Sequence, residues 1–425
     1  MTGEPPVGAG PTLDEDLEDA MAAGASALGV AAGVRRARAW LTRAVEPGSV
    51  DFARYIDHDG PLEAVRRLRG GHVPERIRSL VGARSSVDRS LEDLRSAARC
   101  GARLVVPEDE EWPGYPLHSL TLAMAEEPAE PRDQSPRTTA PVPPVALWVR
   151  GHTRLDEVVD RSVAIVGSRA STAYGEHVAG EFAAGLGDRG WTVVSGGAYG
   201  IDGAAHRGAL AVGAPTVAVL ACGVDRVYPS GHGALFTRIA ESGLLLSEWP
   251  PGSAPHRHRF LVRNRLIAAL TRGTVVVEAA ARSGAQATAK RARRIGKEVM
   301  AVPGPVTSAM SVGCHELLRN PEDGVRLVAS AAHVLEVVGA LGSDLAPPPE
   351  RSPTPRDGLS DVAVRVLDAC PVRAGVTPER LAAVAGCDVL DVLRVLPALE
   401  LADLVQWTGT GWRLTPPAKE TSARR

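Results

Sequence analysis

Aromatic residues are scarce in this chain. They make up 4% of its 425 residues, so its hydrophobic cores must be built mainly from Ala, Val and Leu. A chain of this length is too long for one ordinary core, because single cores stop growing at shorter lengths. We therefore expect two or three domains.

Cysteine is equally sparse. The five cysteines are odd in number, widely scattered and without a CxxC pair, which argues against both a zinc knuckle and a disulfide framework. No apolar stretch is long enough to span a bilayer, and no signal-peptide pattern opens the chain. We expect a cytoplasmic protein with no membrane contact, no metal and no cofactor.

Net charge is close to zero, at −2. Binding of a nucleic acid would therefore depend on local clustering of positive charge. Such a cluster lies between Pro255 and Val299, where eleven Lys and Arg stand against two Glu, a formal charge of +9. A field of this sign suits a polyanion, although a solvated helix face explains Arg291, Arg293 and Arg294 about as well.

Composition divides the chain into seven segments. Residues 1–30 are acidic and predict a disordered tail, and helical spacing of apolar residues over 31–120 predicts a small helical, SAM-like domain. A Pro-rich insertion follows at 121–143, then a core domain at 144–340 and a proline-rich linker at 341–358. Three helices and a hairpin predict a winged-helix domain at 359–415, and 416–425 is a tail.

The core domain alternates apolar runs with amphipathic segments. The runs are "SVAIVG" (162–167), "WTVVSG" (191–196), "TVAVLA" (216–221), "GLLLSE" (243–248), "TVVVEA" (274–279) and "EVMAVPG" (298–304). The segments between them, 175–189, 202–212, 232–242, 262–271 and 285–296, predict helices. Near-continuous apolar strands separated by helices indicate an α/β fold with a Rossmann-like, doubly wound parallel sheet.

Ligands of such sheets bind at the carboxyl ends of the strands, where four segments stand out. Glycines there let the backbone approach a ligand, and the helix N-termini that follow attract anions. The candidate residues are Gly167, Ser168 and Arg169; Ser195, Gly196, Gly197, Tyr199 and Gly200; Arg263, Asn264 and Arg265, expected to flank the opening of a helix; and Ser283, Gly284 and Lys290. Each glycine loop alone is explained equally well by turn chemistry.

A dinucleotide site does not match these loops. The dinucleotide fingerprint is G-x-G-x-x-G, but this chain has Arg169 where the second glycine should stand. The next strand ends in Ser195 rather than in the acid that would bind the ribose. A GxxxxGK[ST] loop is absent as well.

Other chemistries have weaker support in the sequence. His256 and His258 lack further ligands for a metal, and Cys314 and His315 are adjacent, so they rarely face each other. Asp202 and His206 are four residues apart, which favours a helix-stabilising contact over an acid–base pair. No set of paired carboxylates and no Ser/His/Asp set can be assembled from the sequence.

Taken in order, the motifs resemble one family. "VAIVGSR", "SGGAYGIDGAAHRGAL", "GVDRVYPSGH", "LLLSEWPPG", "FLVRNRLIAAL", "VVVEAAARSGAQATA" and "VMAVPGPV" are similar to the motifs of the DprA/Smf family of bacterial DNA-processing proteins, strongly from about Pro144 to Leu318. Departures are Tyr199, where Arg or Lys is usual, His232, where Asn is common, and "GCHELLRNP" in place of a G-x-N-x-L-I ending.

The resemblance implies single-stranded DNA binding, protection of incoming or processed DNA, a homodimer formed through the core, and loading of RecA in natural transformation and recombination. It implies no catalytic reaction, so we expect a protein that is not an enzyme. By position it places the first loop, the second loop, the Arg263–Arg265 segment and Ser283-Gly284 at the DNA.

Two other readings stay open. One is a nucleotide-processing hydrolase of the lysine-decarboxylase-like family. Residues 283–288 stand where that family has its P-G-G-x-G-T-x-x-E loop, and no acid follows them in this chain. The other is a scaffold for recombination proteins. The candidate recognition helix of the winged-helix domain, 388–401, has three acids and only Arg394 as a base, so we expect protein contact there rather than duplex DNA.

Overall fold

The structure is a computed structural model that describes residues 27–81, 87–128, 140–340, 344 and 356–416. The chain divides into two compact units, residues 1–346 and 347–425. The described residues leave out 1–26 of the expected acidic tail, 129–139 of the Pro-rich insertion, most of the linker and 417–425 of the C-terminal tail.

The first unit is built on a nine-stranded sheet of order β1-β2-β6-β5-β4-β3-β7-β8-β9. Its parallel strands are β3 (Ser162–Val166), β4 (Thr192–Ser195), β5 (Thr216–Val219), β6 (Leu244–Ser247), β7 (Gly273–Val276), β8 (Glu298–Ala301) and β9 (Arg326–Leu327). The order reverses at β3, because β4 lies on one side of it and β7 on the other. This topology confirms the predicted doubly wound sheet and puts its switch point between β3 and β7.

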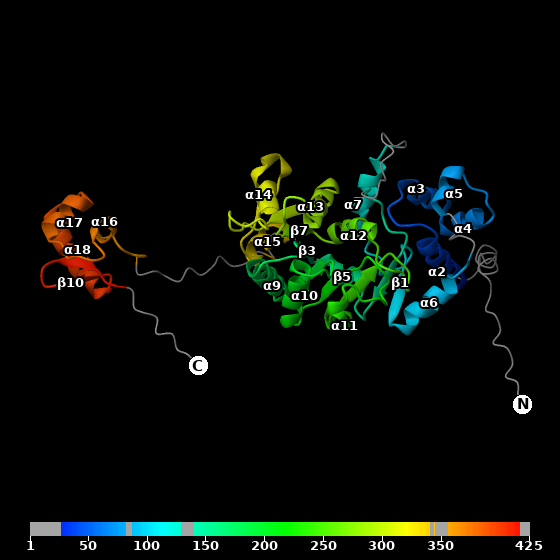
Figure 1. The fold of residues 1–425 in the computed structure, drawn as a ribbon, viewed down its shortest axis with the longest axis horizontal. Helices are drawn as coiled ribbons and strands as arrows, with labels where there is room; N and C mark the ends of the chain where they lie inside the picture. The colour runs from blue at the N-terminus through cyan, green and yellow to red at the C-terminus, as the bar shows by residue number, and fades with distance from the viewer. Residues whose placement is uncertain (1–26, 82–86, 129–139, 341–343, 345–355, 417–425) are drawn as a thin grey trace, which may run out of the picture. The chain divides into compact units, whose positions relative to one another are not determined.

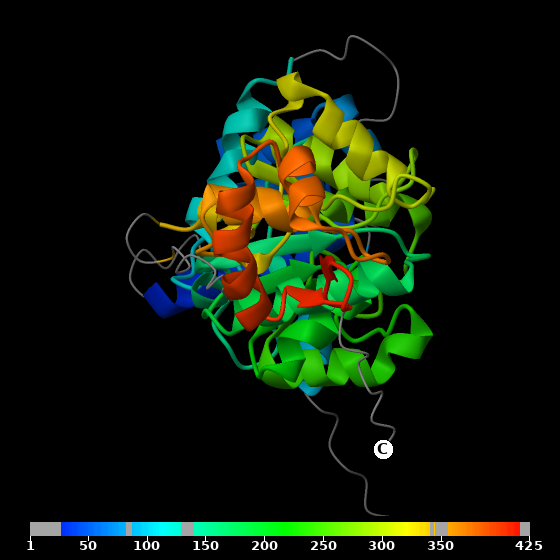
Figure 2. The ribbon, with the colours of Figure 1, turned by 90° about the vertical axis from the view of Figure 1, so that its left-hand side faces the viewer.

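Helices cover both faces of this sheet (Figures 1 and 2). One face carries α7 (Gly114–Ala125), α8 (Leu155–Asp160), α12 (Arg257–Ala269) and α13 (Gly284–Arg294), and the other carries α9 (Ala173–Gly187), α10 (Ile201–Ala211), α11 (Gly233–Ser242) and α15 (Ala331–Val338). α14 (Val312–Arg319) follows β8. Buried strands with helices on both sides explain the continuous apolar runs of the sequence.

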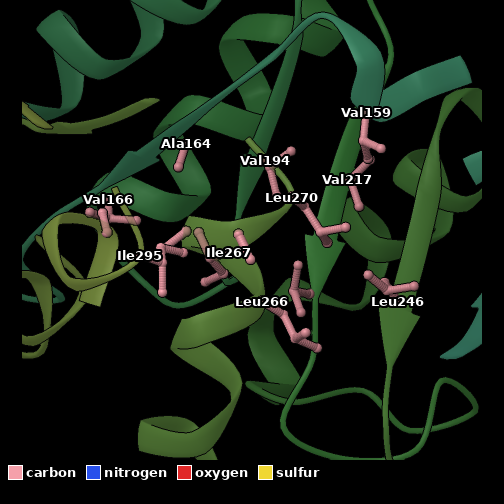
Figure 3. Close-up of a cluster of buried hydrophobic side chains, with 14 of the residues drawn as sticks. Val159, Ala164, Val166, Val194, Val217, Leu246, Leu266, Ile267, Leu270 and Ile295 are labelled. Carbon is pink, nitrogen blue, oxygen red and sulfur yellow. The ribbon is translucent and has the colours of Figure 1, made fainter. Parts of the chain in front are cut away.

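The helix α12 shows how the core is filled. Leu266 and Ile267 of α12, and Leu270 just after it, lie in one cluster with Val194 and Val217 of the sheet (Figure 3), and all five are almost fully buried. Each such aliphatic side chain contributes about 1.5–3 kcal/mol when it leaves water. Aliphatic side chains, Leu and Ile as well as Val and Ala, therefore make up this part of the core.

The N-terminal region contains α2 (Ala27–Ala44), α3 (Val50–Asp59), α4 (Pro61–Arg69), α5 (Glu75–Val81) and α6 (Ser90–Arg99). The strand that follows, β1 (Ala102–Val105), pairs with β2 (Leu147–Arg150), and β2 pairs with β6. Residues from 102 onward therefore belong to the sheet, although we expected the helical domain to run to 120. α7, which the sequence did not predict, packs its Leu117 and Leu120 into the core.

The second unit contains α16 (Asp361–Ala369), α17 (Pro378–Ala385), α18 (Val389–Leu401) and the antiparallel pair β10 (Val405–Trp407) and β11 (Trp412–Leu414), orange and red in Figure 2. Its own core includes Val366, Leu381 and Leu396. Three helices and a hairpin are the predicted elements; their assignment as a winged helix stays a prediction. No helix in the described part of the chain combines the length and apolarity needed to cross a membrane.

Candidate nucleic-acid interface

The strand-end segments meet around one cleft beside the switch point. The cleft has a volume of about 320 Å³. Its walls come from the loops after β3, β4 and β7 and from α12, and they include Gly167, Ser168, Arg169, Ala198, Asp202, Arg263, Asn264, Ser283 and Gly284. Segments more than a hundred residues apart in the chain thus share one site.

The loop after β3 is held by the end of β7. The Ser168 amide donates to the backbone carbonyl of Glu278 at 2.8 Å, and the Glu278 carboxylate accepts from the Thr172 amide at 2.9 Å and from its hydroxyl at 2.6 Å. Gly167 is needed for packing, because a Cβ atom there would lie 2.5 Å from Cγ1 of Ile201. The close approach of α10 therefore explains why position 167 is a glycine.

The loop after β4 turns most of its polar groups inward. The hydroxyl of buried Ser195 donates to the Ile165 carbonyl at 2.7 Å, and the amides of Gly196 and Ala198 donate to Oδ2 of Asp202 at 3.1 and 3.4 Å. Burial raises the pKa of Asp202, against the attraction of Arg263 and of these two amides. Ser195 and Gly196 therefore stabilise the loop and do not face the cleft, contrary to our expectation that they touch a ligand.

Glycine is required twice more in this loop. Gly197 and Gly200 have φ values of +67° and +76°, which side-chain-bearing residues rarely adopt. A Cβ atom on Gly200 would also overlap the Ser168 carbonyl oxygen. The two loops cross at this point, and glycine permits the crossing.

Tyr199 stands at the outer side of the same loop and is 48% exposed. Its ring meets the edge of His232 at a centroid distance of 4.8 Å, and Nδ1 of His232 lies 3.0 Å from the Gly197 carbonyl. Two of the three departures from the family pattern, Tyr199 and His232, therefore contact each other. Tyr199 is not among the residues that line the cleft.

The Arg263–Arg265 segment lies inside a helix rather than at its opening. α12 begins at Arg257, so our prediction of a helix start near residue 262 is wrong. Arg263 is 4% exposed, and its Nη1 donates to the Gly196 carbonyl at 2.8 Å and also to the Val219 carbonyl. Burial lowers the pKa of its guanidinium to about 10, so it stays charged at neutral pH. Arg263 joins the ends of β4 and β5.

Arg265 points away from the cleft. Its guanidinium binds both carboxylate oxygens of buried Glu248, at 2.7 and 2.8 Å, and its side chain is 3% exposed. Residues two apart on a helix face nearly opposite sides, which explains why Arg263 and Arg265 have different surroundings. Arg265 is not part of the interface that we propose below.

The charge of +9 counted between residues 255 and 299 is largely neutralised by acids from other parts of the chain. Arg259 pairs with Glu46, Arg265 with Glu248, Arg272 with Asp160, Arg293 with Asp323 and Arg294 with Glu127. Arg291 is buried and donates to the Ala287 carbonyl at 3.0 Å. The sequence count therefore overestimated the positive field.

A smaller set of cations remains exposed. Arg169, Arg257, Arg282 and Lys290 are exposed, and none of them forms an ion pair with another described residue. Arg169 lies 5.0 Å from the centroid of Phe260, whose ring is 5.4 Å from that of Tyr228. Lys290 stands on α13 outside the residues that line the cleft. Sequence reasoning missed Phe260, although it lies within the motif that carries Arg263.

The rival catalytic groups have other partners. Cys314 is buried, which raises its thiol pKa to about 12, and His315 Nε2 lies 3.0 Å from the Gly304 carbonyl. His206 bonds Thr216 while Asp202 bonds backbone amides, so the expected contact between His206 and Asp202 is replaced. Within the described ranges no group of three His, Cys, Asp or Glu residues could hold a metal ion.

Known proteins are similar to this chain over much of its length. The family model of DNA recombination-mediator protein A matches residues 123–339. A putative DNA processing protein DprA of Mycobacterium tuberculosis is 47% identical over 379 residues, which are 89% of this chain and 94% of that one.

Two solved structures are also similar. The X-ray structure of DNA processing protein A from Streptococcus pneumoniae has a TM-score of 0.51 at 27% identity and covers 78% of this chain and 99% of that one. A structure of the Helicobacter pylori DNA processing protein A, described in terms of its single-stranded DNA binding mode, has a TM-score of 0.42 at 29% identity and covers 48% of this chain and 92% of that one.

Proposed function

Because the chain belongs to the DNA recombination-mediator protein A family, we propose that it binds single-stranded DNA at the switch-point cleft and acts without catalysing a reaction. The observation that carries this proposal is the convergence of four strand-end segments on one cleft, bordered by Arg169. Sequence-tolerant binding follows, because backbone phosphates are the groups that such a cleft and its cations recognise.

The proposed interface is narrower than the sequence suggested. It consists of the Ser168-Arg169 loop, Asn264, the Ser283-Gly284 loop and the exposed cations Arg257, Arg282 and Lys290. Phe260 extends it, because an aromatic ring beside a phosphate-binding arginine can stack with a base. Gly167, Gly197 and Gly200 shape the loops, and Tyr199 stands at the margin.

The hydrolase alternative has less support in the geometry. Its carboxylate would have to be Glu278, but both oxygens of Glu278 are engaged by Thr172. We further propose that the protein works in the cytoplasm as a homodimer and delivers its DNA to RecA during recombination and natural transformation. Light scattering would measure the dimer, and RecA filament assembly on covered single-stranded DNA would measure delivery.

A fluorescence titration with an oligo-dT strand tests DNA binding directly. We expect the affinity to fall about tenfold or more between 50 and 200 mM salt, because several neutralised phosphates release counterions. Equal affinity at both salt concentrations, or no binding at either, contradicts the proposal.

Arg169→Ala supplies the matching variant. It should weaken binding about fivefold to twentyfold, since one charged contact is worth roughly 1–2 kcal/mol, and it should leave the thermal midpoint unchanged. Arg189→Ala is the control, because Arg189 is an exposed arginine between α9 and β4, at the opposite edge of the sheet. Weakening of both variants to the same extent would mean that the cleft is not the binding site.

A further inference from the structure

The helix after the first strand of a doubly wound sheet normally offers its N-terminus to a phosphate group. In this chain that helix is α9, beside the switch point between β3 and β7. Its N-terminus is already occupied by a carboxylate of the protein itself. Glu278 lies just beyond the end of β7 and accepts from the amide and the hydroxyl of Thr172, the residue that caps α9.

The first turn of α9 leaves room for this carboxylate. Glu278 is 1% exposed, and a Cβ atom on Gly175 would overlap its Oε2. Glycine at position 175 therefore makes room for Glu278. The carboxylate takes the place that an incoming anion would occupy, and its negative charge matches the positive end of the helix dipole.

The next helix, α10, has a carboxylate of its own, which bonds the loop before the helix. Asp202, in its first turn, accepts from the amides of Gly196 and Ala198. It lines the cleft and is 8% exposed. An anion that approached the start of α10 would therefore meet a carboxylate.

The start of α13 is different. Its cap is the neutral Ser283, whose hydroxyl accepts from the Gln286 amide at 3.4 Å. Gly284 is exposed, with no atom within 4 Å of the position that a Cβ would take. Both residues line the cleft. Of these three helix starts, α13 is the one where no carboxylate accepts from the cap or the loop before the helix; Glu316 accepts from the Gln286 side chain at 3.1 Å.

We propose that Glu278 and Asp202 are specificity-determining residues that exclude the phosphates of free nucleotides from the starts of α9 and α10. A terminal phosphate carries close to two negative charges and requires a compact anion site, whereas each phosphate within a DNA strand carries one. The cleft then accepts strand phosphates at α13 and at Arg169 and rejects nucleotides. This inference rests in part on the proposed function, because it assigns that cleft its selectivity.

Glu278→Gln tests the inference with little change in shape. The glutamine oxygen can still accept from the Thr172 amide, and its NH2 group can donate to the Thr172 hydroxyl, so one bond is kept and the other is reversed while the charge is removed. We expect the wild-type protein to bind AMP and inorganic pyrophosphate only weakly in calorimetry at low salt. Glu278→Gln should bind both about fivefold to tenfold more tightly, as expected for removal of one like charge at close range. Glu241→Gln is the matched control, because Glu241 is exposed near the end of α11; it should behave as wild type.

Two results overturn the inference. One is a wild-type protein that binds AMP as tightly as the variant does. The other is a Glu278→Gln protein with the wild-type thermal midpoint and no gain for either probe. If Glu278→Gln does not fold, Asp202→Asn undergoes the same titrations with the same criteria.

Failure of this inference can be told from failure of the proposed function. The nucleotide titrations compare variants with wild type and need no DNA. A protein that fails to bind oligo-dT but gains AMP affinity on Glu278→Gln refutes the proposed function and supports the selectivity. A protein that binds oligo-dT in a salt-dependent manner without that gain supports the proposed function and refutes the selectivity.

Discussion

Replacement of Arg263 by alanine should destabilise the fold before it affects DNA contact. The guanidinium donates to the Gly196 and Val219 carbonyls, which end β4 and β5 on one side of the cleft. Alanine removes both bonds and leaves two acceptors in a site where Arg263 itself is 4% exposed. The loop after β4 then loses its attachment to α12.

The size of the effect follows from these bonds. A hydrogen bond to a charged donor contributes roughly 1.5–3 kcal/mol, and release of a buried guanidinium from its desolvation cost offsets part of the loss. We therefore expect Arg263→Ala to lower the free energy of unfolding by about 2–4 kcal/mol. At roughly 2–4 °C per kcal/mol for a large domain, the thermal midpoint should fall by about 5–15 °C.

Circular dichroism at 222 nm, followed through a thermal scan and a urea titration, measures this change. Arg263→Lys should recover part of the stability, because an ammonium can reach one of the two carbonyls. Arg169→Ala, measured beside it, should keep the wild-type midpoint. If Arg263→Ala unfolds at the wild-type temperature and still loses oligo-dT binding, Arg263 is a DNA contact and our structural assignment is refuted.

Two further predictions concern acid stability and the second unit. His206 is fully buried, with Nδ1 beside Thr216 and with Nε2 bonded to no other described residue, and burial lowers its pKa from 6.5 to about 3. Because the unfolded chain then takes up a proton that the folded chain does not, the free energy of unfolding should fall by a few kcal/mol as pH drops from 6.5 toward 3. Urea titrations of His206→Asn should show a smaller fall. The isolated unit 347–425 should bind duplex DNA far more weakly at physiological salt than a basic winged helix would. The reason is that α18 exposes Leu390, Leu393 and Leu401 and has Arg394 as its only basic residue. A gel shift with a submicromolar midpoint would contradict this.

The sequence predicted the sheet because its signal is local. A run such as "SVAIVG" places apolar side chains on both faces of a strand, and such a pattern is typical of a strand that is buried on both sides. The sequence did not predict α7, because Pro113 and Pro116 lie at its start and suggest a connection. Proline is compatible with the first turn of a helix, so the same residues fit both interpretations.

The candidate site was predicted only in part, because its charges are compensated over long distances. Glu46, Glu127 and Glu248 neutralise arginines of the basic segment, and their pairing depends on the tertiary fold. Phe260 was missed for the same reason, since its contact with Arg169 joins α12 to a loop some ninety residues earlier. A count of charges along the chain contains neither kind of information.

The glycine-rich loops resemble a nucleotide site for reasons of packing rather than of ligand binding. Gly167 admits Ile201 and Gly175 admits Glu278, and Gly200 lets the two loops cross. A strand end with this composition therefore indicates close backbone approach, and the approaching group can be the protein itself. This cleft differs from a nucleotide site in the group that lies at each helix start. Since carboxylates fill those of α9 and α10, a phosphate chain is left with the start of α13 and the exposed cations around it.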